Sequence, residues 1–163
     1  MNDAGSWPSA LRQAVALGGW LLLSFAPGAT GVFVDTGSWY AQLQKPSWNP
    51  PAWVFGPVWT CLYLSMGFAA WLVWRRGGWR TQRLALSLFL VQLLLNALWT
   101  PLFFGWHRPD WAFFEILLLL VAISAVILLF FRCSRLAALL LAPYLAWTAF
   151  AAFLTFTIWR MNS

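Results

Sequence analysis

The sequence predicts an all-α integral membrane protein whose single domain, residues 1–163, is a bundle of five transmembrane helices. Two observations support this prediction. The chain is 62% hydrophobic and only 9% charged, with a mean hydropathy of +0.72, whereas a soluble domain carries about 25% charged residues. Five segments also reach the roughly 20 mostly apolar residues that a membrane-spanning helix needs. A water-soluble fold of this length could not bury so much apolar surface, so lipid must be the solvent for much of it.

The five predicted spans cover residues 11–33, 54–74, 84–104, 111–131 and 136–159. The first span is too long for the apolar core of a signal peptide, and it ends at Val34 and Asp35 without a clear cleavage site. The link from Arg132 to Arg135 is very short. The last two helices are therefore expected to be antiparallel neighbours.

The basic residues predict the orientation of the chain. With five spans, the N-terminus and the second and fourth loops share one side and hold seven arginines: Arg12, Arg75, Arg76, Arg80, Arg83, Arg132 and Arg135. The other side holds three cations: Lys45, Arg108 and Arg160. This asymmetry predicts a cytoplasmic N-terminus in a bacterial inner membrane. The net charge of +6 is thereby explained by topology and anionic lipid headgroups, so we expect membrane lipid, and no nucleic acid, as a partner.

The common catalytic and metal-binding patterns are absent from the sequence. The only carboxylates are Asp3, Asp35, Asp110 and Glu115. Glu115 lies about one turn inside the fourth span, where it is either a hydrated residue near the headgroups or a functional polar position. Cys61 and Cys133 form no metal-binding spacing with His107, so we expect free cysteines and no metal site.

Polar residues inside the spans point to an interior site. Gln92, Asn96 and Trp99 follow i, i+4, i+7 spacing on the third span and therefore share one face. Burying an amide without a partner costs roughly 2 kcal/mol or more, so this face should turn inward. Two interpretations stay open: the amides hydrogen-bond neighbouring helices, or they contact a ligand.

Two other spans repeat this combination of aromatic and hydrogen-bonding groups. Trp59 and Tyr63 lie one turn apart on the second span. The fifth span carries a similar side: Tyr144, Trp147, Thr148, Ala151 and Thr155. The chain has 14 tryptophans, far more than two interfacial belts need. Indoles and a few amides around a shared interior suit a flat or rigid, largely apolar ligand.

The loop over residues 35–52 is predicted to be a stiff lid over one mouth of the bundle. From Trp39 to Pro51 it reads W-Y-A-Q-L-Q-K-P-S-W-N-P-P. Proline fixes the local backbone and restricts the residue before it. The residues expected to form the lid are Trp39, Tyr40, Pro46, Trp48, Pro50 and Pro51. The alternative is an aromatic anchor at the membrane interface.

These motifs resemble the translocator protein family, also called the tryptophan-rich sensory proteins (TspO/MBR). The loop from Trp39 to Pro51 is similar to the family's signature, and it continues into W-V-F-G-P-V-W-T-C-L-Y up to Tyr63. The spacing of Gln92, Asn96 and Trp99, the segment P-L-F-F-G and the segment P-Y-L-A-W-T-A-F-A also match. The resemblance covers nearly the whole chain and agrees with five helices.

The resemblance implies a five-helix bundle, often a homodimer, that binds porphyrins, sterols and isoquinoline- or benzodiazepine-type drugs. It places ligand contacts at six positions: Trp59, Asn96, Trp99, Trp111, Trp147 and Ala151. No cofactor is required, and protoporphyrin or a haem-like tetrapyrrole is the expected ligand. The implied location is a bacterial envelope membrane or the mitochondrial outer membrane.

Two departures from the family pattern weaken the case for sterols. Thr155 stands where the family commonly has asparagine, and Phe156 stands where the cholesterol-recognition pattern has tyrosine. That pattern is weak even when it is complete. Sterol binding is therefore less supported than porphyrin binding.

The leading functional prediction is a membrane receptor for porphyrins and related hydrophobic ligands, acting in tetrapyrrole handling or stress signalling. The first alternative is an enzyme that oxidises porphyrin in light, with Trp59 and Trp147 as the catalytic candidates that the resemblance implies. The second is a transporter of these ligands, although the sequence has no visible inverted repeat or pair of broken helices.

Overall fold

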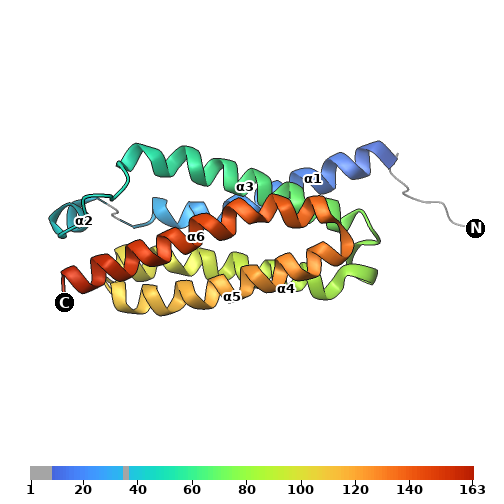
Figure 1. Cartoon of the computed structure of the whole chain (residues 1–163). Helices are drawn as coiled ribbons and strands as arrows, with labels where there is room; N and C mark the ends of the chain where they lie inside the picture. The colour runs from blue at the N-terminus through green and yellow to red at the C-terminus, as the bar shows by residue number, and fades with distance from the viewer. Residues whose placement is uncertain (1–8, 35–36) are drawn as a thin grey trace, which may run out of the picture.

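The computed structural model describes residues 9–34 and 37–163, and the regular elements within those residues are helices (Figure 1). The chain begins with α1 (Ser9–Phe25), which continues directly into the 3₁₀ helix η1 (Ala26–Val32). A short helix, α2 (Ser38–Gln42), lies in the loop before the second span. The remaining elements are α3 (Ala52–Trp74), α4 (Gly78–Thr100), the π-helical turn η2 (Pro101–Gly105), α5 (Pro109–Cys133) and α6 (Arg135–Met161).

Five helical stretches of the described chain are long and apolar enough to cross a membrane. They are Ser9–Val32, Ala52–Trp74, Gly78–Gly105, Pro109–Cys133 and Arg135–Met161. This confirms the predicted fold class, an all-α bundle of five transmembrane helices. The protein is a multi-pass integral membrane protein, and lipid contacts its outer surface.

The third span begins earlier than expected, at Gly78 rather than near residue 84. Its first turns carry Arg80 and Arg83, which the sequence pattern assigns to a loop because they are charged. A helix can extend beyond the hydrocarbon layer, however, and there its charged side chains reach water and headgroups. The turn from α3 is correspondingly tight: Gly77 (φ 123°) and Gly78 (φ 60°) adopt left-handed backbone angles that favour glycine.

The five long helices form a closed ring. Around the ring, α1 packs on α3, α3 on α6, α6 on α5 and α5 on α4, and η1 closes the ring against α4. The short link at Ser134 makes α5 and α6 antiparallel neighbours, as expected. In Figure 1 the loop with α2 and the C-terminus lie at one end of the bundle, and the α3–α4 and α5–α6 turns lie at the other.

The interior has two apolar clusters. The larger one is centred on fully buried side chains of α3, α4 and α5, including Met66, Phe89 and Phe130. The smaller one lies at the α2 end and joins Leu102 and Phe103 of η2 to Ala112, Leu154 and Ile158 of α5 and α6. The ligand-sized space described below lies between α3, α4 and α6, beside this smaller cluster.

α1 and α3 approach each other closely at Gly67. A Cβ atom on this glycine would lie 2.8 Å from the Cα of Leu21 and 3.0 Å from the carbonyl oxygen of Trp20. These neighbours are backbone atoms and cannot move aside cheaply. Small residues at helix contacts in membranes let backbones approach in this way.

We therefore expect Gly67→Ala to lower the free energy of unfolding in detergent by about 1–3 kcal/mol, the usual cost of overpacking a close contact. Thermal unfolding measures the effect. Gly18→Ala on α1 is the matched control, because a Cβ there meets nothing within 4 Å. Equal melting temperatures for the two variants would contradict the close approach.

Candidate ligand-binding site

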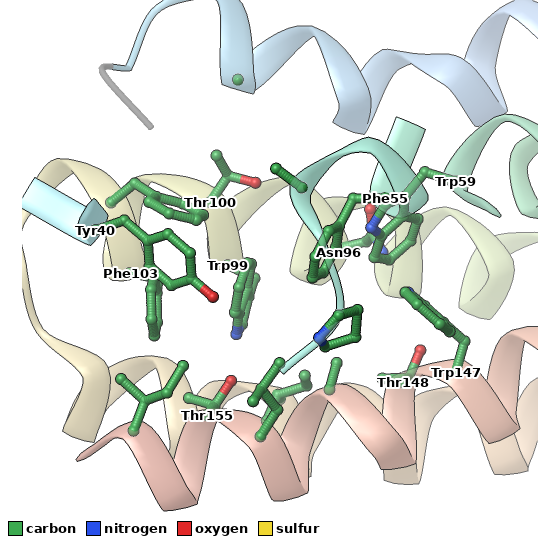
Figure 2. Close-up of a pocket in the computed structure, with 18 of the residues that line it drawn as sticks. Tyr40, Phe55, Trp59, Asn96, Trp99, Thr100, Phe103, Trp147, Thr148 and Thr155 are labelled. Atoms are coloured by element: carbon green, nitrogen blue, oxygen red, sulfur yellow. The ribbon is translucent and has the colours of Figure 1, made fainter. Parts of the chain in front are cut away.

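A cavity of about 640 Å³ lies between α3, α4 and α6, under the loop that carries α2 (Figure 2). Ligand pockets commonly measure about 300–1,000 Å³. The walls are mostly aromatic and aliphatic, with polar groups at a few positions. α5 contributes Ile116 and Leu119 behind these walls, and η1 contributes Gly28 and Gly31.

The structure brings most of the expected ligand contacts to this one cavity. Trp59 comes from α3, Asn96 and Trp99 come from α4, and Trp147 and Ala151 come from α6 (Figure 2). Trp59 and Trp147, the two catalytic candidates, therefore face the same space. Their contact with a ligand stays a prediction.

Trp111 is not brought to the cavity. Its side chain is 54% exposed on the outside of α5, and the Arg108 guanidinium lies 5.1 Å from its ring centroid. The buried face of α5 at this level is formed by Ala112, Glu115 and Ile116. Residue 111 lies to one side of that face, so its indole points away from the interior of the bundle.

The proposed lid divides into two parts. Tyr40, Pro50 and Pro51 line the cavity, together with Lys45 and Asn49. Trp39, Pro46 and Trp48 do not line it. The ring of Trp48 stacks on Phe153 with centroids 5.2 Å apart, and the ring of Trp39 stacks on His107 at 4.5 Å. The loop thus covers the cavity with one set of residues and is held on the bundle by another.

Hydrogen bonds give this loop a fixed shape. The Tyr40 hydroxyl donates to Asn49 Oδ1 (2.9 Å). The Lys45 ammonium donates to the carbonyl oxygens of Tyr40 (2.7 Å), Leu43 (2.9 Å) and Ala41 (3.4 Å). Burial raises the pKa of the Tyr40 phenol, and the bond to Asn49 lowers it. The phenol therefore remains a protonated donor at neutral pH.

The loop is also tied to the end of α6. The backbone N–H of Gln44 donates to Asn162 Oδ1 (2.9 Å), and Asn162 Nδ2 donates back to the Gln44 carbonyl (2.9 Å). The same Nδ2 donates to the Ile158 carbonyl (2.7 Å), which fixes the amide on the last turn of α6. This pair joins positions 118 residues apart.

Asn96 lies at the centre of a hydrogen-bonded chain across three helices. The Tyr63 hydroxyl donates to Asn96 Oδ1 (3.2 Å), and Asn96 Nδ2 donates to the Tyr144 hydroxyl (3.1 Å). Tyr144 in turn donates to Gln92 Oε1 (2.9 Å). Asn96 therefore bonds between helices and also lines the cavity, so the two interpretations left open by the sequence are compatible.

The aromatic walls contain residues that the sequence analysis did not select as ligand contacts. Phe55 packs edge-on against Trp147 (centroids 5.9 Å apart), and Phe103 stacks on Trp99 (5.0 Å). Phe55 precedes Trp59 by four residues, so helical periodicity places it on the same face. Phe103 lies in η2 after the helix changes pitch at Pro101, and simple periodicity does not extend through such a turn.

Glu115 turns inward and is only 8% exposed, which contradicts its interpretation as a hydrated residue near the headgroups. Within the described residues neither carboxylate oxygen has a hydrogen-bond partner. Cys61 and Cys133 are both free, as expected. Among residues 9–34 and 37–163, no group of three or more His, Cys, Asp or Glu side chains could hold a metal ion.

Comparison with known proteins shows which sequences this chain resembles. Residues 15–160 match the sequence profile of the TspO/MBR family. The human translocator protein is 48% identical over 126 residues, which cover 76% of this chain and 75% of the relative. The tryptophan-rich protein TspO of Chlorobaculum tepidum is 42% identical over 93% of this chain and 96% of its own length. The tryptophan-rich sensory protein of Cereibacter sphaeroides is 39% identical over 84% and 85%.

We expect Asn96→Leu to destabilise the unliganded protein by about 2 kcal/mol, because two interhelical hydrogen bonds are lost and the Tyr63 hydroxyl is left buried without its acceptor. Tyr63→Phe is the control, since it removes one bond of the chain and keeps the ring. It should cost about half as much. Thermal stability and ligand affinity are measured on one preparation, and an unchanged stability of Asn96→Leu would contradict the role of the amide between the helices.

Proposed function

Because this chain belongs to the TspO/MBR family, we propose that it is a membrane receptor whose interior cavity binds porphyrins and related flat, hydrophobic molecules. Sterols and isoquinoline-type drugs form the wider ligand class. The protein would act in tetrapyrrole handling or stress signalling. The observation that carries the proposal is the aromatic cavity of about 640 Å³ with Trp59, Trp99 and Trp147 on its walls.

The chemistry of the walls supports a flat apolar ligand. Indole and phenol rings offer large rigid faces at little cost in side-chain entropy, and offset stacking adds about 0.5–1.5 kcal/mol per pair beyond area burial. Trp59 is already stacked on Tyr63, with centroids 5.3 Å apart, so its indole is held in one orientation. A preorganised wall loses less entropy when a ligand binds.

Light-dependent oxidation of a bound porphyrin is a second candidate function, and one arrangement favours it. Trp59 lies against Tyr63 and also approaches Tyr144, with ring centroids 6.3 Å apart. Trp147 faces the same cavity from α6. Two indoles on the neighbouring helices α3 and α6 would both touch a ligand between them. Receptor and enzyme share this site and differ in what happens to the ligand under illumination.

We expect protoporphyrin to quench the tryptophan fluorescence of the protein and a Trp59→Phe, Trp147→Phe double variant to lose a large part of that quenching, because both indoles face the cavity. Trp53→Phe is the matched control, since Trp53 is 76% exposed and does not line the cavity. If the double variant binds and quenches like the parent, Trp59 and Trp147 do not contact the ligand in a shared cavity.

The same preparations separate receptor from enzyme. If the absorption spectrum of bound protoporphyrin changes on illumination in the parent and not in the double variant, the result supports light-dependent oxidation of the ligand. A spectrum that stays constant in the parent supports binding without turnover.

We expect Asn162→Ala to raise the ligand off-rate several-fold, because it removes both hydrogen bonds that tie the loop to α6, and loosening a lid acts mainly on dissociation. Stopped-flow displacement of protoporphyrin measures the rate. Ser163→Ala, one residue further along, is the control and should leave the rate unchanged. If the two variants release ligand equally slowly, the loop is an interfacial anchor and does not gate the cavity.

A further inference from the structure

Thr148 of α6 lacks the local hydrogen bond that three other hydroxyl side chains on the long helices make. Thr60, Ser124 and Thr157 each donate to the carbonyl oxygen four residues earlier, at 2.9, 2.8 and 2.9 Å. This local bond is the usual way in which a helix satisfies such a hydroxyl. Thr148 is 1% exposed and lines the cavity, yet its Oγ1 bonds no other described residue. Ser24 is also buried and unpaired in the described chain, but it does not line the cavity.

Two further polar groups of the cavity wall also lack a hydrogen-bond partner among the described residues. Thr155 lies seven residues after Thr148, on the same side of α6, and is 2% exposed. No hydrogen bond joins its hydroxyl to another described residue. Trp99 faces α6 from α4, and its Nε1–H has no acceptor in the described part of the chain. In Figure 2 the hydroxyls of Thr148 and Thr155 stand on the side of α6 that faces Trp99.

The spacing of these groups suits an extended ligand edge. Seven residues of α-helix rise about 10 Å, and Ala151, between the two threonines, leaves room along the helix. Leaving a buried polar group unpaired costs about 1–3 kcal/mol. The Thr148 hydroxyl and the Trp99 N–H are two such groups on one cavity, and together with the Thr155 hydroxyl they are available to a ligand that accepts hydrogen bonds.

The charge of the wall restricts that partner further. Lys45 is the charged side chain among the residues that line the cavity. Its ammonium already donates to three carbonyl oxygens of the loop and lies 4.8 Å from the centre of the Tyr40 ring. An ionised carboxylate deep in the cavity would meet no free cation on the wall, and burying it unpaired would be costly.

We propose that Thr148, Thr155 and Trp99 form a neutral hydrogen-bonding rail that selects ligands carrying uncharged acceptors, such as carbonyl or ester oxygens, on the edge that enters the cavity. Ionised groups of the same ligand stay outside, at the loop. This inference rests on the proposed function and adds its specificity: the site recognises the neutral edge of a flat molecule and not its charge.

The test uses three probes of similar flatness: protoporphyrin IX, its dimethyl ester and pyrene, which has no hydrogen-bond acceptor. The variants are the double substitution Thr148→Val, Thr155→Val, which keeps the side-chain shape, and the control Thr157→Val. Thr157 lies on α6, does not line the cavity and donates to the Phe153 carbonyl. Affinities are measured in detergent by fluorescence titration.

For the parent protein we expect the dimethyl ester to bind at least as tightly as the free acid. In the double variant the affinity for the dimethyl ester, whose ester carbonyls are neutral acceptors, should fall about tenfold, the scale of one or two neutral hydrogen bonds. The affinities for pyrene and for the free acid, whose acceptors are its ionised propionates, should stay within about twofold of the parent. The unliganded melting temperature should hold or rise, because no hydrogen bond of the described chain is lost. The variant Thr148→Ser, Thr155→Val, which keeps one of the two hydroxyls, should retain part of the affinity for the dimethyl ester, and Thr157→Val should change none of the three affinities.

Parent-like affinity of the double variant for the dimethyl ester would overturn the rail while leaving the cavity as a ligand site. The rail is also overturned if the dimethyl ester binds the parent tenfold more weakly than the free acid, because the site would then recognise the ligand by its charge. If the parent binds none of the three probes, the proposed function fails and the rail fails with it.

Discussion

A polar side chain inside a bilayer must find its hydrogen-bond partners within the protein. At the centre of this bundle, the chain of Tyr63, Asn96, Tyr144 and Gln92 supplies them for both ends of the Asn96 amide and for Gln92 Oε1. Each member lies on a different turn, and together they connect α3, α4 and α6. These are the same three helices that form the walls of the cavity. The same hydrogen bonds therefore also fix the distance and rotation of the walls, and with them the orientation of Trp59, Trp99 and Trp147.

The two ends of the bundle are built differently. Toward the α3–α4 turn the helices pack closely around Met66, Phe89 and Phe130, and α1 approaches α3 to backbone contact at Gly67. Toward the α2 end the same helices enclose a cavity, because bulky rings such as Phe103 and Phe55 line its walls without filling it. A tightly packed half gives rigidity to a half that has space for a ligand. The loop from Leu43 to Pro51 covers that space and is joined to the last turn of α6.

The polar groups of the cavity fall into two classes with different consequences. Asn96, Tyr40 and Lys45 have partners within the chain, and they hold the site in shape. The hydroxyls of Thr148 and Thr155 and the indole N–H of Trp99 have none among the described residues. Groups of the first class set the stability of the site, whereas groups of the second class are available to a ligand. Because all three of the available groups are neutral, specificity in this cavity follows from the position of acceptors and from ring shape, and the charge of the ligand contributes little.

The sequence by itself determined the number of spans and which side chains share a face. Both are local properties: hydropathy is summed over about 20 neighbouring residues, and helical periodicity places Gln92, Asn96 and Trp99 on one side whatever surrounds them. The tertiary structure alone decided which neighbour each face meets. In the folded protein Trp111 points outward and Glu115 inward from adjacent turns of α5. α4 begins at Gly78, and Gln44 hydrogen-bonds Asn162 across 118 residues. The tertiary structure also decided that the Thr148 hydroxyl lacks the local carbonyl bond that Thr157 makes. Such outcomes depend on how five helices rotate and pack against one another, and no local sequence pattern encodes that rotation.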